Sequence, residues 1–146
     1  MKASILVIDD EESLRFTFGR FLAFAGHRVV TAGSCEEARE RIGRGEFDLI
    51  LMDVSLPDGS GLDLLEEIRR GCPDCPVIVI TAYPSVETAR DTLRMGAFDY
   101  IAKPVRQRTV MESVNQALRQ KGRSEAKEAC RPLERGKKEA HGDGYR

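Results

Sequence analysis

The sequence has no long apolar run. No stretch of its 146 residues approaches the roughly 20 consecutive apolar residues that a membrane-spanning helix needs. The N-terminus also lacks the basic segment, the apolar segment and the small-residue cleavage site of a secretory signal peptide. We therefore expect a soluble, cytoplasmic protein that contacts no membrane. The length leaves room for one domain of ordinary size and little more.

The sequence also lacks an excess of one charge, with 23 basic and 24 acidic residues. Residues 121–146 hold 8 basic and 5 acidic groups, against 15 basic and 19 acidic groups in residues 1–120. This difference is too small to indicate a nucleic-acid-binding surface. The chain contains neither a GxxxxGK[ST] phosphate-binding loop nor a recognisable helix-turn-helix. We therefore expect this chain itself to bind no nucleic acid.

Cysteine is scarce, and the four cysteines do not resemble the disulfide framework of a small secreted domain. Cys72 and Cys75 form a CPDC motif that precedes an apolar strand, whereas a redox-active pair sits at a helix N-terminus, where the helix dipole lowers the thiol pKa. A zinc site would need two further ligands, and neither Cys35 nor Cys130 has a partner at ligand spacing. We interpret the motif as a loop between a helix and a strand, with a redox or metal role as the less favoured alternative.

Short apolar runs alternate with amphipathic segments along the chain. The apolar runs predict strands at residues 4–9, 27–32, 49–52, 76–81 and 98–102. The amphipathic segments predict helices at about residues 11–25, 35–42, 61–70, 87–95 and 106–120. Five strands alternating with five helices through short connections predict an α/β fold, a doubly wound parallel sheet with helices on both faces.

Local signals support these helix boundaries. Ser34 and Ser85 are expected to cap the second and fourth helices, and Gly26 and Gly96 to end the first and fourth. Nine apolar side chains are expected to face inward: Leu14, Phe18, Phe21, Leu22 and Ala25 on the first helix, and Val110, Val114, Ala117 and Leu118 on the last. Residues 121–146 are too polar to form a core, so we expect a linker or tail, helical at most up to Pro132.

Polar residues gather where the predicted strands end. Asp9 and Asp10 end the first strand, and Asp53 the third; Thr81 ends the fourth strand, and Lys103 follows the fifth. In an open parallel sheet, ligands bind beyond the carboxyl ends of the strands. Three neighbouring carboxylates repel one another unless a cation is present, and Mg²⁺ is the cation that suits such oxygen ligands. We therefore interpret Asp53 as a nucleophile beside a metal, with lysine and threonine groups to bind an anion.

Each of these residues also has a simpler interpretation. Asp9 or Asp10 could cap the first helix, Thr81 could be an ordinary strand-end residue, and Lys103 could be a solvated lysine. Asp58, together with the glycine that follows it, is interpreted as part of a turn. The joint arrival of polar residues at four strand ends favours the functional interpretation over these simpler ones; these residues are Asp9, Asp10, Asp53, Thr81 and Lys103.

The segments IDDEESLR, DVSLPDGSGLDLL, VIVITAY and AFDYIAKP, in this order and spacing, resemble the receiver domain of two-component response regulators. The resemblance covers residues 4 to about 120 and implies a flavodoxin-like sheet with strand order 2-1-3-4-5, in a receiver domain over residues 1–120. It implies that Asp53 accepts a phosphoryl group from a phosphohistidine, on a sensor histidine kinase or a phosphotransfer protein. Such a domain is not an enzyme, beyond catalysing its own phosphorylation and dephosphorylation.

The resemblance also implies a metal site. Asp10, Asp53 and the backbone carbonyl of Ser55 would bind Mg²⁺ directly, and Asp9 would act through water. Mn²⁺ is an expected substitute. The same residues would then hold both the metal and the acceptor oxygen.

Further residues would act on the phosphoryl group and report its presence. Thr81 and Lys103 would contact the group, with a cis peptide between Lys103 and Pro104. Thr81 and Tyr100 would form the switch that alters a surface made by residues 85–118. That surface would contact a downstream protein or output domain, or a second copy in a phosphorylation-dependent homodimer.

TAYPSVETA and LRMGAFDYIAKP are similar to receivers of the nitrogen-regulation class, which precede an ATPase and a DNA-binding domain. Since this chain shows neither, it is either a regulator that acts by protein contact, or a receiver fragment of a transcriptional activator or hybrid kinase. Two other classes fit poorly. An aspartyl-phosphate phosphatase of the haloacid dehalogenase type would carry DxDx[TV] after its first strand, and a flavodoxin-like cofactor binder would want a phosphate-binding loop where this chain has DDEES.

Overall fold

Five parallel strands form one central sheet in the computed structural model, which describes residues 2–122. The strands are β1 (Ser4–Ile8), β2 (Arg28–Ala32), β3 (Leu49–Asp53), β6 (Val77–Thr81) and β7 (Asp99–Ala102). Their order across the sheet is β2-β1-β3-β6-β7, and every neighbouring pair is parallel. Counted along the chain within this sheet, this is the predicted order 2-1-3-4-5. The predicted doubly wound parallel sheet is therefore confirmed.

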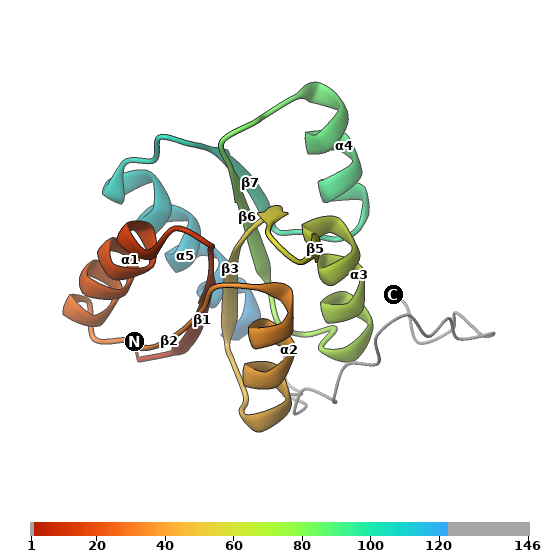
Figure 1. The fold of residues 1–146 in the computed structure, drawn as a ribbon. Helices are drawn as coiled ribbons and strands as arrows, with labels where there is room; N and C mark the ends of the chain where they lie inside the picture. Colours follow the sequence, from red (N-terminus) through yellow and green to blue (C-terminus); the bar gives the residue numbers. More distant parts are fainter. Residues whose placement is uncertain (1, 123–146) are drawn as a thin grey trace.

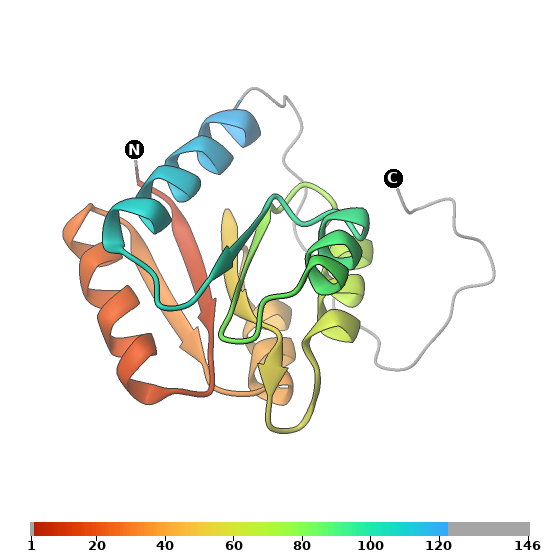
Figure 2. The same ribbon diagram turned by 90° about the horizontal axis from the view of Figure 1, so that it is seen from above.

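Helices cover both faces of the sheet (Figures 1 and 2). One face carries α1 (Glu12–Phe24) and α5 (Gln107–Gly122), and the other carries α2 (Cys35–Arg44), α3 (Gly61–Gly71) and α4 (Val86–Arg94). Because β1 lies between two covered faces, its side chains alternate between two apolar clusters. Ile5 and Val7 pack in the cluster with α1 and α5, whereas Leu6 and Ile8 pack in the cluster with α2 and α3. This double burial explains the continuous apolar runs of the central strands.

A short hairpin after β3 was not predicted. Its strands are β4 (Ser55–Leu56) and β5 (Gly59–Ser60), which pair in antiparallel fashion across a turn at Pro57 and Asp58. Strands of two residues are too short to show an apolar period, so sequence patterns give no signal for them. The hairpin connects the end of β3 to the start of α3.

Most predicted helix boundaries agree with the structure. The Ser34 hydroxyl accepts the backbone N–H of the residue three positions later at 3.1 Å, and the Ser85 hydroxyl does the same at 3.0 Å. Gly26 and Gly96 follow the first and fourth helices with φ of 98° and 104°, a backbone region that favours glycine. The four α5 side chains predicted to face inward are all buried.

Three details differ from the sequence predictions. Ala25 is exposed because α1 ends at Phe24 and Ala25 is already its C-cap. The helix α2 continues two residues beyond Ile42, to Arg44. The N-cap of α1 is Glu11, with no side-chain hydrogen bond, so neither Asp9 nor Asp10 caps this helix.

Residues 2–122 include all but the first residue of the predicted receiver domain, but only the first two residues of the predicted tail. The boundary at residue 120 stays a prediction, and α5 continues to Gly122. The helix predicted up to Pro132 lies outside the described residues. Among residues 2–122, no helix is both long enough and apolar enough to cross a bilayer.

Candidate functional site

Four polar side chains lie at the carboxyl edge of the sheet. Asp9 follows β1, Asp53 ends β3, Thr81 ends β6, and Lys103 follows β7. Asp9 and Asp53 are only 2% and 4% exposed, and Thr81 is 1% exposed. The edge is formed by parallel strands in register, so residues that are distant in sequence arrive side by side. The structure therefore brings together these four of the five residues that the sequence pattern predicted at this edge, and the fifth, Asp10, lies beside Asp9 and Asp53.

Three carboxylates form a compact cluster at this edge. Asp9, Asp10 and Asp53 each offer one oxygen, and these oxygens lie within 4.8 Å of one another. Asp10 is exposed, whereas the other two are buried. Carboxylate oxygens are hard ligands of the kind that Mg²⁺ prefers. The donor set therefore fits a divalent cation.

Lys103 is the cation of the cluster. Its Nζ lies 2.8 Å from Asp53 Oδ2, 3.0 Å from Asp9 Oδ2 and 3.4 Å from Glu11 Oε1. Burial alone lowers the pKa of the Lys103 ammonium, but the hydrogen bonds to Asp53 and Asp9, together with the negative charges of these carboxylates, outweigh burial and raise that pKa. Burial raises the pKa of the Asp9 carboxyl, although the Glu11 N–H and Lys103 act in the opposite direction. One ammonium facing several carboxylates leaves the site with an excess of negative charge.

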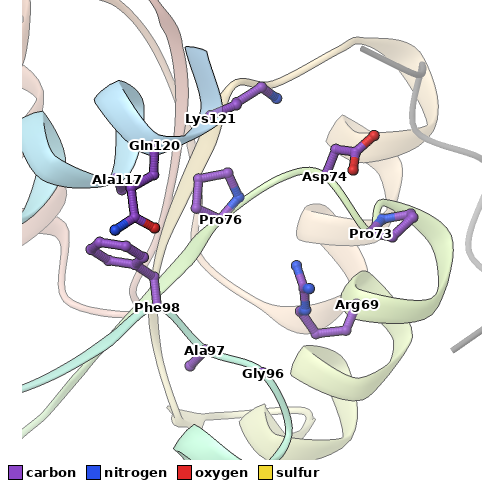
Figure 3. Close-up of a pocket in the computed structure, with 10 residues that line it drawn as sticks. All are labelled: Arg69, Pro73, Asp74, Pro76, Gly96, Ala97, Phe98, Ala117, Gln120 and Lys121. Carbon is purple, nitrogen blue, oxygen red and sulfur yellow. The ribbon is translucent and has the colours of Figure 1, made fainter. Parts of the chain in front are cut away.

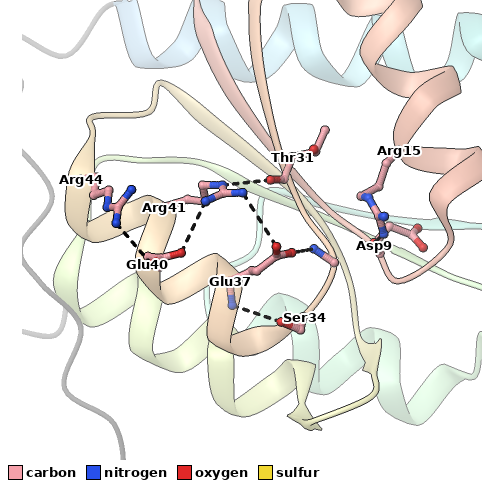
Figure 4. Close-up of polar contacts among 9 residues, drawn as sticks. Asp9, Arg15, Thr31, Ser34, Glu37, Glu40, Arg41 and Arg44 are labelled. Atoms are coloured by element: carbon pink, nitrogen blue, oxygen red, sulfur yellow. Dashed lines mark hydrogen bonds and ion pairs between the residues drawn. The ribbon is translucent and has the colours of Figure 1, made fainter.

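Backbone contacts fix the segments that carry these side chains. The Glu11 N–H donates to Asp9 Oδ1 at 2.9 Å, and Arg15 Nη1 donates to the Asp9 carbonyl at 2.7 Å. Figure 4 shows the Arg15 guanidinium beside Asp9, at the end of β1. The Lys103 N–H donates to the Thr81 carbonyl at 2.7 Å, and the Lys103–Pro104 peptide bond is cis. The cationic and acidic parts of the site are thus held by separate backbone contacts.

The loop after β3 places Ser55 next to the site. The Ser55 N–H donates to Asp53 Oδ1 at 2.9 Å, and Ser55 then opens the hairpin strand β4. The Thr81 hydroxyl accepts the Tyr83 N–H at 3.1 Å, so its present rotamer is tied to the start of the following loop. The roles predicted for both residues, metal ligation and phosphoryl contact, stay predictions.

Tyr100 connects β7 to the start of α4. Its ring is half-buried, and its hydroxyl shares a hydrogen bond of 2.7 Å with Thr88 Oγ1. The same hydroxyl accepts the Ser85 N–H at 3.3 Å. Tyr100 is a half-buried residue of β7, which agrees with the sequence pattern, but its two hydrogen-bond partners were not predicted. The Ser-x-x-Thr spacing at the helix start was the available signal, since Ser85 Oγ also lies 2.7 Å from Thr88 Oγ1.

The described residues also form a pocket of about 400 Å³ at the opposite edge of the sheet. It lies where β6 and β7 begin and where α5 ends, and Figure 3 shows Arg69, Phe98 and Lys121 around it. None of the clustered carboxylates lines this pocket. The acidic cluster is therefore a separate feature of the described residues.

The CPDC motif occupies the connection between α3 and β6. Both cysteine side chains are buried, and Cys75 is a free thiol, so the two are not bonded to each other. Burial raises the pKa of Cys75 to about 12 and, with the neighbouring Asp58 carboxylate, the pKa of Cys35 to about 11. Thiols that are protonated at neutral pH are poor nucleophiles and poor metal ligands.

Comparison with known proteins agrees with this geometry. A family model described as the response regulator receiver domain matches residues 5–115. The chain is 44% identical over 128 residues to the response regulator protein PilR of Pseudomonas aeruginosa, covering 85% of this chain and 28% of PilR. It is 37% identical over 116 residues to the DNA-binding transcriptional regulator NtrC of Azospirillum brasilense, covering 80% of this chain and 24% of NtrC. The chain thus spans about a quarter of the length of these curated relatives.

Solved structures share the fold. A CheY-like receiver domain protein from Methanospirillum hungatei superposes with a TM-score of 0.81 at 32% identity, covering 84% of this chain and 98% of that protein. NtrX from Brucella abortus superposes with a TM-score of 0.79 at 33% identity, covering 84% of this chain and 28% of NtrX. The family match, the acidic edge of the sheet and these relatives agree: this chain belongs to the response regulator receiver domain family, with relatives among the NtrC-class regulators.

Proposed function

We propose that Asp53 accepts a phosphoryl group from the phosphohistidine of a sensor histidine kinase or a phosphotransfer protein. One observation carries the proposal: the buried Asp53 carboxylate contacts Lys103 at 2.8 Å and lies in one cluster with Asp9 and Asp10. A nucleophile, acids able to hold a metal and a cation for the anion are thus gathered at one edge of the sheet.

The acidic cluster is proposed to hold Mg²⁺. Asp10, Asp53 and the Ser55 carbonyl would be its direct ligands, with Asp9 acting through a bound water, and Mn²⁺ also suits these oxygens. Bound there, the ion would neutralise negative charge on the phosphoryl oxygens. The excess of carboxylates over ammonium groups in the cluster supports this assignment.

In the proposed transfer, an Asp53 oxygen forms a bond to phosphorus while the bond from phosphorus to the donor imidazole nitrogen breaks. The electron pair of that bond leaves with the imidazole, and Asp53 becomes an acyl phosphate. Lys103 can donate hydrogen bonds to the phosphoryl oxygens, because its Nζ already lies at the acceptor carboxylate. Later attack of water on phosphorus releases phosphate and restores the carboxylate. The chain is thus a phosphoacceptor that catalyses only its own modification.

The proposed switch couples Asp53 to the surface of residues 85–118. The Thr81 hydroxyl would exchange the Tyr83 N–H for the phosphoryl group, and Tyr100 would leave Thr88 and turn inward. This surface includes the exposed Val86 of α4, which is 76% exposed and suits a protein contact. Changing the ratio of the switched to the unswitched conformation from 1:99 to 99:1 requires about 5.5 kcal/mol of differential stabilisation. A phosphoryl group that makes several hydrogen bonds and contacts a metal ion can supply this energy.

Two kinds of partner are proposed for this surface. The receiver domain of NtrC4, 33% identical to this chain, forms a beryllofluoride-activated dimer, which supports a phosphorylation-dependent homodimer here. PilR and NtrC are much longer than this chain, which favours the alternative that it is the receiver part of a transcriptional activator. A hybrid kinase is the less supported origin.

Binding of beryllofluoride, a mimic of the phosphoryl group, tests the acceptor assignment. We expect a protein-bound ¹⁹F resonance in the presence of Mg²⁺, and none with Asp53→Asn. A bound resonance that persists in Asp53→Asn would place the acceptor elsewhere. No bound resonance with the unaltered chain would contradict the proposed function.

A further inference from the structure

The hairpin after Asp53 is fastened at its tip to a different helix. Asp58, in the hairpin turn, accepts the Cys35 N–H on Oδ1 at 2.8 Å and the Glu36 N–H on Oδ2 at 3.0 Å. Cys35 and Glu36 are the first two residues of α2. Both oxygens of one carboxylate therefore bind a helix start that lies 22 and 23 residues away in sequence.

The N-terminus of α2 is capped by two side chains, Asp58 and the local N-cap residue Ser34. Ser34 Oγ accepts the Glu37 N–H, and the Glu37 carboxylate accepts the Gly33 N–H at 2.6 Å (Figure 4). The first three N–H groups of the helix thus each have a side-chain partner, two of them on Asp58. These two N–H donors lower the pKa of the Asp58 carboxyl, which keeps the charged form in place. A local cap is therefore already present, and Asp58 adds a connection between two parts of the fold.

The base of the hairpin is closed tightly against β3. The Ser55 N–H is held by Asp53 Oδ1, and the Gly61 N–H donates to the Val54 carbonyl at 3.0 Å. A Cβ at Gly61 would overlap the Val54 backbone, so only glycine allows this approach. With the base closed and the tip held by Asp58, the segment that presents Ser55 is fixed at both ends.

The start of α2, which holds the hairpin tip, is also connected to the end of β1, the strand that Asp9 and Asp10 follow. The Asp9 N–H donates to the Ala32 carbonyl at 3.0 Å, at the point where β2 ends beside β1. Only Gly33 and Ser34 separate Ala32 from α2. A continuous path of hydrogen bonds and short chain therefore runs from Asp9 through the start of α2 to Asp58.

We propose that Asp58 is a positioning residue for the metal and phosphoryl site. It holds the Ser55 carbonyl and the acceptor loop at a fixed place relative to the acids that follow β1, so that all metal ligands are pre-organised. The inference rests on the proposed function, because the ligands it positions are those assigned there. Asp58 is not among the residues proposed above to bind the metal or to contact the phosphoryl group.

The test is Mg²⁺ binding to Asp58→Ala, followed in amide NMR spectra. We expect the dissociation constant for Mg²⁺ to rise about 10-fold, the usual effect of removing a group that orients metal ligands. Asp58→Asn retains one acceptor oxygen and should recover part of the affinity. Without metal, amide hydrogen exchange at Cys35 and Glu36 should be faster in Asp58→Ala than in the unaltered chain, and in Asp58→Asn it should be faster at the amide that loses its acceptor oxygen. Saturating Mg²⁺ should restore phosphorylation from acetyl phosphate, because the reacting groups remain.

Ser34→Ala is the matched control, since it removes the local cap of the same helix and leaves the hairpin contact in place. We expect it to lower the melting temperature but to change the Mg²⁺ dissociation constant by less than about 2-fold. An equal loss of affinity in Ser34→Ala and Asp58→Ala would reduce Asp58 to a helix cap and overturn the inference. Unchanged affinity in Asp58→Ala would overturn it as well. If the unaltered chain binds no Mg²⁺, the proposed function itself is contradicted. That result differs from the two outcomes above, in which the unaltered chain binds Mg²⁺ and only the role of Asp58 is overturned.

Discussion

Single residues at the acidic edge act through charge balance. Lys103 Nζ contacts the buried carboxylates of Asp9 and Asp53. In the metal-free protein it therefore neutralises part of the negative charge that a bound metal cation would also neutralise. The positions of these residues at the ends of predicted parallel strands were enough to predict that they share one edge of the sheet, because the carboxyl ends of parallel strands lie at the same edge. The contacts of Lys103 with both Asp9 and Asp53 could not be predicted in this way, because they depend on side-chain conformations.

Replacing Lys103 tests this balance. Lys103→Ala leaves Asp9 and Asp53 buried without their ammonium partner, so we expect a loss of about 1–3 kcal/mol in the free energy of unfolding without metal. Mg²⁺ should stabilise this variant more than the unaltered chain, because the lysine no longer competes for the carboxylates. Urea denaturation with and without Mg²⁺ measures both effects.

Lys121→Ala is the control for Lys103→Ala. Its Nζ lies 3.9 Å from Asp48, a long ion pair far from the acidic edge, so we expect a change below about 1 kcal/mol and no difference in the response to Mg²⁺. A Lys103→Ala protein as stable without metal as the unaltered chain would contradict the charge-balance argument.

His27 provides a pH dependence that is independent of the site. Its Nδ1 accepts the Ala3 N–H at 3.1 Å, and burial, with a contribution from the positive N-terminus, lowers its pKa below the ordinary 6.5. The unfolded chain therefore binds a proton at higher pH than the folded chain does. Stability is complete above about pH 6.5 and falls as the pH drops towards the folded pKa. Denaturation between pH 7.5 and 5 should show this slope, and His27→Gln should flatten it; an unchanged slope would contradict the assignment.

At the scale of elements, the regular parts of the fold were predictable and the connections were less so. Apolar runs located all five strands of the sheet because the central ones are buried on both faces. The hairpin of β4 and β5 was not predicted, because strands of two residues are too short to show the alternation of apolar and polar residues that identifies a strand. The Asp58 contact was not predicted either, because it joins residues 22 and 23 positions apart, and nothing local distinguishes a turn aspartate from one that caps a distant helix. The inward face assigned to Ala25 was wrong because the helix ends one residue earlier.

Two glycines test how closely the elements pack. Gly61→Ala forces a Cβ into the Val54 backbone, so we expect a loss of about 1–3 kcal/mol in the free energy of unfolding. Gly43→Ala, inside α2 with no atom within 4 Å of the new Cβ, should instead stabilise the protein by about 0.5–1 kcal/mol. Thermal and urea denaturation of the pair measure the difference. Equal effects from the two substitutions would show that the hairpin base is not held as described.

At the scale of the whole molecule, this receiver domain is a parallel sheet with an acidic carboxyl edge. The layers of α1 and α5 on one face, and of α2, α3 and α4 on the other, hold the strand ends in register. The acidic edge contains buried carboxylates, whose burial costs stability, and the sheet tolerates them because Lys103 lies among them. The fold that orders the strand ends therefore also places Lys103 where it offsets this cost.

The most direct test of the central claim is the intact mass of the protein after incubation with acetyl phosphate, with and without Mg²⁺, beside Asp53→Asn under the same conditions. We expect the gain of one phosphoryl group only with Mg²⁺, and no gain in Asp53→Asn. A Mg²⁺-dependent gain in Asp53→Asn equal to that of the unaltered chain, or no gain in the unaltered chain, would contradict the claim that Asp53 is the phosphoacceptor.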